Sequence, residues 1–115
     1  MTRGGTNTAE GPEACVVLCT APDEDAARRI AYGLVERRVA ACVNLVPGLT
    51  SVYRWQGRVE EATEILLVAK TTPARLAELE AAIVELHPYD TPEIVALRPT
   101  HVAARYLAWL AEETR

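Results

Sequence analysis

The segment from His87 to Ile94 carries side chains that can bind a metal ion or transfer a proton. It reads His-Pro-Tyr-Asp-Thr-Pro-Glu-Ile and holds an imidazole, a phenol and two carboxylates around two prolines. It separates a helix-patterned segment from a strand-patterned one, and functional side chains often lie on such connections. No complete set of catalytic residues accompanies it in the sequence. We therefore expect a binding role, and we do not expect an enzyme.

Cys19 is the second candidate, because it lies near the end of the apolar run from Cys15 to Thr20. Cysteine with histidine is a donor pair suited to copper, zinc or similar metals. The same pair could act as nucleophile and base, but no local motif supplies an orienting group or an oxyanion site. Two ligands are few for a metal, so Asp90, Glu93, water or a neighbouring subunit would have to complete the site. A histidine that simply ends a helix is the alternative for His87.

Composition predicts one globular domain over residues 14–115 after a disordered tail over residues 1–13. The chain has 115 residues, half of them hydrophobic, and a formal net charge of −4. That charge argues against nucleic-acid binding, and no apolar run approaches the roughly 20 residues that a membrane span needs. No secretory signal pattern is visible, so we expect a cytoplasmic location. An odd number of cysteines without a Cys-x-x-Cys pair fits neither a disulfide framework nor a structural zinc site.

Hydrophobic periodicity predicts four strands and three helices. Their order along the chain is strand 15–20, helix 23–37, strand 40–55, strand 58–71, helix 73–86, strand 92–99 and a last helix capped by Thr100. Pro47-Gly48 should interrupt the second strand, and Gln56-Gly57 should close a long hairpin. The order βαββαβ with one extra helix is that of an α+β, ferredoxin-like sandwich.

This topology places Cys19 near the segment that begins at His87. The first and second strands run parallel, the third lies between them, and the fourth flanks the first on its other side. Right-handed crossovers put both connecting helices on one face of the sheet. The end of the first strand then lies beside the start of the fourth. Cys19 and the residues from His87 to Glu93 should share one end of the sheet.

The other face of this sheet should remain open to a partner. The first, third and fourth strands are apolar on both faces, and one final helix is too little to cover them. We therefore predict burial against other subunits; the alternative is that this helix and a folded-back hairpin suffice. Tyr53 and Trp55 share one face of the hairpin and are either core beneath a loop or interface anchors. We favour the interface.

Over residues 15–112 the chain resembles the CutA divalent-cation tolerance family. The segments that carry the resemblance are Leu-Cys-Thr-Ala-Pro-Asp from Leu18, Ala-Ala-Cys-Val-Asn from Ala40, Ser-Val-Tyr-Arg-Trp-Gln-Gly from Ser51, Lys70-Thr71, His-Pro-Tyr-Asp-Thr-Pro-Glu-Ile from His87, and Tyr-Leu-Ala-Trp-Leu from Tyr106. The resemblance implies a ferredoxin-like subunit in a homotrimer, akin to the PII signalling proteins, with hairpins that pair through Tyr53 and Trp55. It also implies Cys19 and His87 as ligands of copper or another divalent metal. Some members carry a second histidine where this chain has Leu86.

The expected function is that of a trimeric divalent-cation tolerance protein that binds copper or another divalent metal and responds to it. Its expected partners are further copies of itself and metal ions. One alternative is a PII-like sensor of a small metabolite, bound in the clefts between subunits. The other is a trimer that anchors a partner without metal chemistry.

Overall fold

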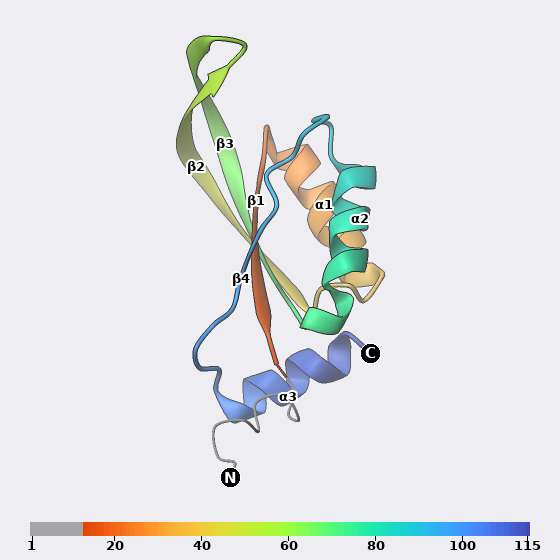
Figure 1. Ribbon diagram of the computed structural model, residues 1–115. Helices are drawn as coiled ribbons and strands as arrows, with labels where there is room; N and C mark the ends of the chain where they lie inside the picture. Colours follow the sequence, from red (N-terminus) through yellow and green to blue (C-terminus); the bar gives the residue numbers. More distant parts are fainter. Residues whose placement is uncertain (1–12) are drawn as a thin grey trace.

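A computed structural model describes residues 13–115 and confirms the predicted order of elements (Figure 1). The elements are β1 (Cys15–Ala21), α1 (Glu24–Glu36), β2 (Cys42–Trp55), β3 (Arg58–Thr71), a 3-10 turn η2 (Pro73–Arg75), α2 (Leu76–Leu86), β4 (Val95–Leu97) and α3 (Ala104–Glu113). The sheet has the strand order β2-β3-β1-β4, and every neighbouring pair is antiparallel. Apart from Glu13, the tail predicted over residues 1–13 lies outside the described residues. Within residues 13–115, no helix is long and apolar enough to cross a membrane.

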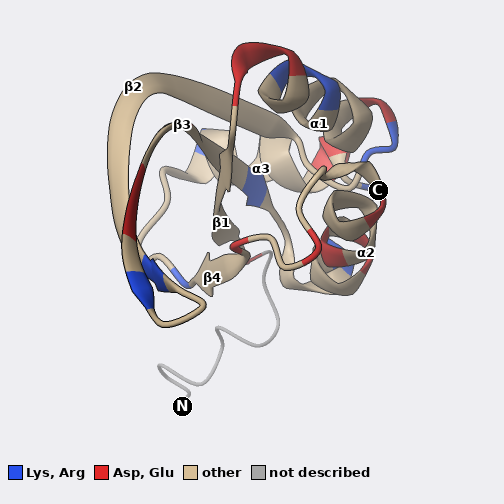
Figure 2. Ribbon diagram, turned by 90° about the horizontal axis from the view of Figure 1, so that it is seen from above, with Lys and Arg blue, Asp and Glu red and all other residues tan. Residues whose placement is uncertain are grey.

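Both connecting helices cover the same face of the sheet, as the right-handed crossovers predict (Figures 1 and 2). Helix α1 begins where the Asp23 carboxylate accepts a hydrogen bond from the Ala26 N–H at 2.8 Å. Helices α1 and α2 approach closely at Gly33, where a Cβ atom would lie 2.6 Å from the Cδ1 atom of Leu86. The core between helices and sheet is made of small and branched apolar side chains, including Val17, Cys19, Ile30, Leu34, Leu67, Leu79 and Ile83.

The opposite face of the sheet is apolar and largely uncovered. Leu18 pairs with Val68 on one side and with Val95 on the other, so these three side chains share that face. Leu18 and Val68 are half-buried, while Val95 and Leu97 are exposed. Helix α3 lies across the lower end of the sheet in Figure 1, which we call the underside. Among its apolar residues only Leu110 is fully buried. The prediction that the last helix leaves this face open is confirmed within the described chain.

The β2–β3 hairpin projects well beyond the rest of the molecule (Figure 1). The radius of gyration is 15.8 Å, against about 13 Å for a compact domain of this length. Gln56 and Gly57 have φ values of 50° and 79°, as a tight two-residue hairpin turn requires. The register shifts between Val46 and Leu49, which confirms the predicted interruption. The length of the hairpin comes from its two 14-residue strands.

Tyr53 and Trp55 lie on one face of this hairpin, opposite Glu60 and Arg58 on β3. Their side chains are 44% and 53% exposed, so within this chain they are not a core beneath a loop. Their predicted role as interface residues stays a prediction.

The first three elements differ from the sequence prediction by at most two residues at an end, and three later elements differ more. The last helix begins at Ala104 and not after Thr100, because residues 98–103 are non-helical and carry the chain from the edge of the sheet to its underside (Figure 1). The fourth strand spans three residues and not 92–99, since β1 pairs with only Val95–Leu97. Helix α2 begins at Leu76, after η2, and the Thr72 side chain makes no capping hydrogen bond.

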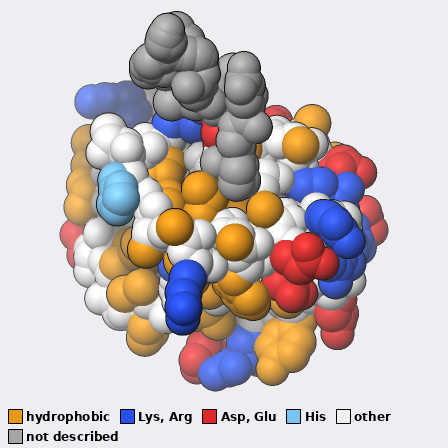
Figure 3. Space-filling view, turned by 90° about the horizontal axis from the view of Figure 1, so that it is seen from below, with side chains coloured by type: hydrophobic (Ala, Val, Ile, Leu, Met, Phe, Trp, Pro, Cys, Tyr) orange, Lys and Arg blue, Asp and Glu red, His pale blue; other side chains and the backbone are white. Residues whose placement is uncertain are grey.

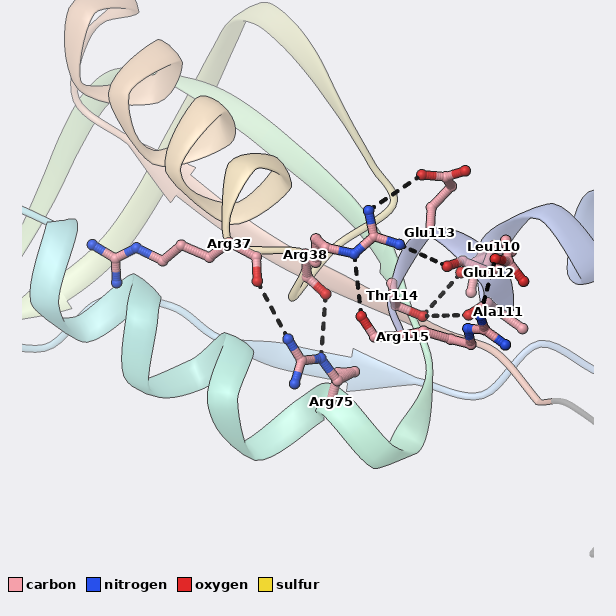
Figure 4. Close-up of polar contacts among 9 residues, drawn as sticks. All are labelled: Arg37, Arg38, Arg75, Leu110, Ala111, Glu112, Glu113, Thr114 and Arg115. Carbon is pink, nitrogen blue, oxygen red and sulfur yellow. Dashed lines mark hydrogen bonds and ion pairs between the residues drawn. The ribbon is translucent and has the colours of Figure 1, made fainter.

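Arg38 holds the C-terminal end of α3 (Figure 4). Its Nη2 and Nε atoms donate to the main-chain oxygens of Glu112 at 2.8 Å and Arg115 at 3.1 Å, and Nη1 lies 3.7 Å from the Glu113 carboxylate. The last carbonyls of a helix have no partner within the helix, and a cation there also complements the helix dipole. Arg75 in turn donates to the main-chain oxygen of Arg38 at 3.2 Å. The loop after α1 therefore caps α3 from a distant part of the sequence.

The underside, where α3 lies, shows hydrophobic side chains interspersed with charged ones (Figure 3). Tyr106 and Trp109 are both exposed on α3, and their ring centroids are 5.5 Å apart. Helix α3 thus presents an aromatic pair to its surroundings, while its Leu110 side chain is fully buried.

We expect Arg38→Asn to lower the free energy of unfolding by about 1–2 kcal/mol, because charged donors are lost at the end of α3. Arg38 has a φ of 60°, and asparagine tolerates that conformation, so the loss reports the guanidinium contacts. Urea denaturation at one fixed protein concentration measures the change. Arg28→Asn is the control, since the Arg28–Glu24 pair lies on the open surface of α1 and should change stability by less than about 0.5 kcal/mol. Equal losses in the two variants would contradict the assigned role of Arg38.

Candidate functional site

The end of β1 and the α2–β4 connection meet at one end of the sheet (Figure 1). The Nε2 atom of His87 lies 2.7 Å from the main-chain oxygen of Thr20, the residue after Cys19. The charges of Glu93 and Glu64 both act on the Cys19 thiol. This confirms the topological prediction that Cys19 and the segment from His87 to Glu93 share one end of the sheet.

His87 uses both nitrogens of its ring for internal hydrogen bonds. It follows the last residue of α2 in an extended conformation, which the next residue, Pro88, favours. The Nδ1 atom accepts a hydrogen bond from the Tyr89 N–H at 3.1 Å. Because a backbone N–H can only donate, Nδ1 carries no proton, and Nε2 carries the proton that is donated to Thr20. The residue is 7% exposed.

Cys19 points into the core between the sheet and the helices and is 2% exposed. Burial raises the pKa of the Cys19 thiol to about 12, and the nearby charges of Glu93 and Glu64 add to the rise. The thiol is therefore protonated at neutral pH, whereas metal binding and nucleophilic attack both use the thiolate.

Glu64 is a buried residue of this region that the sequence analysis did not single out. It lies on β3, is 6% exposed, and accepts a hydrogen bond from the Tyr89 hydroxyl at 2.7 Å. Burial and this bond raise the pKa of Tyr89 to about 12. The strand period carries the signal, since Glu64, Leu66 and Val68 alternate along one face and the first of them is an acid. A buried carboxylate next to apolar neighbours marks a position with a specific partner.

Three hydrogen bonds thus connect β1, the α2–β4 connection and β3. Thr20 accepts from His87, His87 accepts from the Tyr89 backbone, and the Tyr89 hydroxyl donates to Glu64. The His87 and Tyr89 rings lie beside each other, with centroids 4.8 Å apart. We call these four residues the corner network.

The donor types at this corner suit a transition metal, but their bonding does not form a metal centre. The His87 nitrogens are both occupied and the Cys19 thiol is protonated. Asp90 and His101 are exposed. Across residues 13–115, no group of three or more His, Cys, Asp or Glu side chains is arranged to hold an ion. The residues therefore do not fit a preformed metal site, and metal binding by Cys19 and His87 stays a prediction.

Residues 15–113 match the model of a protein family described as CutA1 divalent ion tolerance protein. The divalent-cation tolerance protein CutA of Thermus thermophilus is 56% identical over 99 residues, which cover 86% of this chain and 96% of the relative. A solved structure of the Thermus thermophilus divalent cation tolerance protein aligns with a TM-score of 0.87 at 54% identity and covers 89% of this chain and 99% of its own. That of CutA from Xylella fastidiosa aligns with a TM-score of 0.88 at 36% identity and covers 90% and 99%.

We expect Tyr89→Phe to lower the free energy of unfolding by about 1–3 kcal/mol, because it removes the hydroxyl that donates to the buried Glu64 carboxylate. Urea denaturation measures the change. Tyr32→Phe is the matched control: it removes the same atom from an exposed side chain on α1 and should change stability by less than about 0.5 kcal/mol. A Tyr89→Phe variant as stable as this control would show that the Tyr89–Glu64 bond contributes nothing.

Proposed function

Because the chain belongs to the CutA1 divalent ion tolerance protein family, we propose that it acts in divalent-cation tolerance as a homotrimer without enzymatic chemistry. The observation that carries this proposal is the apolar face of the sheet that α1 and α2 leave uncovered. An exposed apolar surface of this kind marks an interface. The three cysteines are unpaired, which suits a reducing compartment and supports a cytoplasmic location.

The hairpin supports self-association in the same way. Tyr53 and Trp55 are exposed on one of its faces, and Val52 and Val59 are exposed on the other. Aromatic side chains of this kind are enriched at the centre of protein interfaces. If the hairpin of one copy covers the open face of the next, one repeated contact closes a ring. The resemblance to CutA proteins suggests three copies in that ring.

The metal part of the proposal concerns the assembled protein and not a centre inside one chain. Copper or another divalent metal is the ion that the family suggests. The corner network already uses the His87 nitrogens. The net charge of −4 on each chain attracts cations, and the electrostatic potentials of the copies add together when they associate. We therefore propose that divalent metal ions bind where copies of the chain meet.

We expect sedimentation equilibrium at micromolar concentration to give three times the mass of the 12.6 kDa chain. Val95→Asp should shift the protein towards smaller species, because it places a charge on the open face of the sheet. Val84→Asp is the control: Val95 and Val84 are 45% and 54% exposed, but Val84 lies on α2, away from that face. A folded wild-type monomer, or equal behaviour of the two variants, would contradict assembly through the sheet.

We expect zinc or copper ions added to the metal-free wild-type protein to raise its melting temperature, because a ligand that binds only the native state stabilises it. The rise should reverse with a chelator and persist in Cys19→Ala. It should disappear in Val95→Asp, where the copies are separated. Differential scanning calorimetry measures these shifts. A wild-type protein that does not respond would refute the metal part of the proposal, and a response in the separated chains would refute its dependence on assembly.

A further inference from the structure

We infer that His87 is a positioning residue, held in one tautomer by the corner network, and that it is closed to metal ions in the folded chain. His101, the chain's other histidine, is exposed and is then the imidazole that a metal ion reaches first. The inference uses only contacts within one chain, so it does not depend on the proposed trimer or metal response.

A metal ion has no free access to the His87 ring. A metal at Nε2 would displace the Thr20 oxygen, and a metal at Nδ1 would displace the Tyr89 N–H. Thr20 is buried as well as His87. Each displacement would leave a polar group of the main chain without its partner, which is costly in a buried setting. A metal would also have to open the corner to reach a ring that is 7% exposed.

His87 also positions the residues around it. The chain bends after His87, and the His87 and Tyr89 rings lie beside each other with centroids 4.8 Å apart. The Nδ1 bond fixes the Tyr89 backbone, and the adjacent His87 ring limits where the phenol can go. The Tyr89 hydroxyl then reaches the buried Glu64 carboxylate. His87 therefore acts through Tyr89 to satisfy a charge on β3.

The residue before His87 is part of the contact between α1 and α2. The Leu86 side chain packs against Gly33, where a Cβ atom would force it to move, and the Leu86 oxygen accepts a hydrogen bond from Arg29 at 3.4 Å. Leu86 thus packs in the contact between α1 and α2. Because residue 86 is leucine, no neighbouring imidazole can bind a metal ion in place of His87, whose two nitrogens are already hydrogen-bonded.

Long-range ¹H–¹⁵N spectra of the full-length labelled protein test this directly, since its two histidines give two sets of ring signals. We expect His87 to show the tautomer with the proton on Nε2. Stoichiometric zinc chloride should leave its signals in place, and copper(II) chloride should broaden those of His101 first. His87 signals in the other tautomer, or shifted or broadened before those of His101, would overturn the inference.

Substitution of His87 separates positioning from ligation. His87→Asn keeps an acceptor for the Tyr89 N–H, whereas His87→Ala removes it. We expect the Tyr89 amide to exchange with solvent about tenfold faster in His87→Ala, a factor worth about 1.4 kcal/mol, and at nearly the wild-type rate in His87→Asn. Failure of His87→Asn to protect this amide would contradict the positioning role, and His87→Asn carries the test if His87→Ala does not fold. The tautomer of His87 and the exchange rate of the Tyr89 amide can be measured even if no metal ion stabilises the wild-type protein. Failure of the proposed metal response would therefore be distinguished from failure of this inference.

Discussion

The arrangement of this molecule depends on one constraint: both helices that connect the strands lie on the same side of the sheet. Right-handed crossovers impose this side, and it gives β1 and β3 one fully packed face and one open face. The packed face is filled by small and branched residues, and α1 and α2 are brought together at Gly33. The open face carries apolar residues that the short α3 helix leaves largely uncovered. Self-association is the physical consequence that we propose.

The same packing determines what the corner can do. Because β1 ends beneath the α2–β4 connection, the Thr20 carbonyl lies where the His87 ring can bond to it. Cys19, on the packed face, is buried among apolar side chains, and its pKa is raised accordingly. Donor types that suggest a metal pair in the sequence are therefore used here for packing and internal hydrogen bonds. Residue type alone does not reveal this, because the neighbours of each side chain in the fold decide whether it is buried or already hydrogen-bonded.

The sequence predicted the features that local chemistry controls. Gln56-Gly57 forms the hairpin turn, Pro47-Gly48 interrupts β2, and the helix before Pro88 ends as expected. The errors lie where tertiary contacts decide. Thr100 has the type of a helix cap, but the chain must first cross to the underside of the sheet, so α3 starts at Ala104. Glu64 was overlooked because its partner, the Tyr89 hydroxyl, comes from a distant segment. The capping of α3 by Arg38 has the same origin.

A crystal structure of the protein grown with a divalent metal ion would show the open face of the sheet and the corner network together. We expect copies packed through the open face of the sheet, with the His87 ring still bonded to Thr20 and any ion bound elsewhere. An ion shared by the Cys19 sulfur and the His87 ring, or a solvent-exposed sheet face, would contradict this expectation.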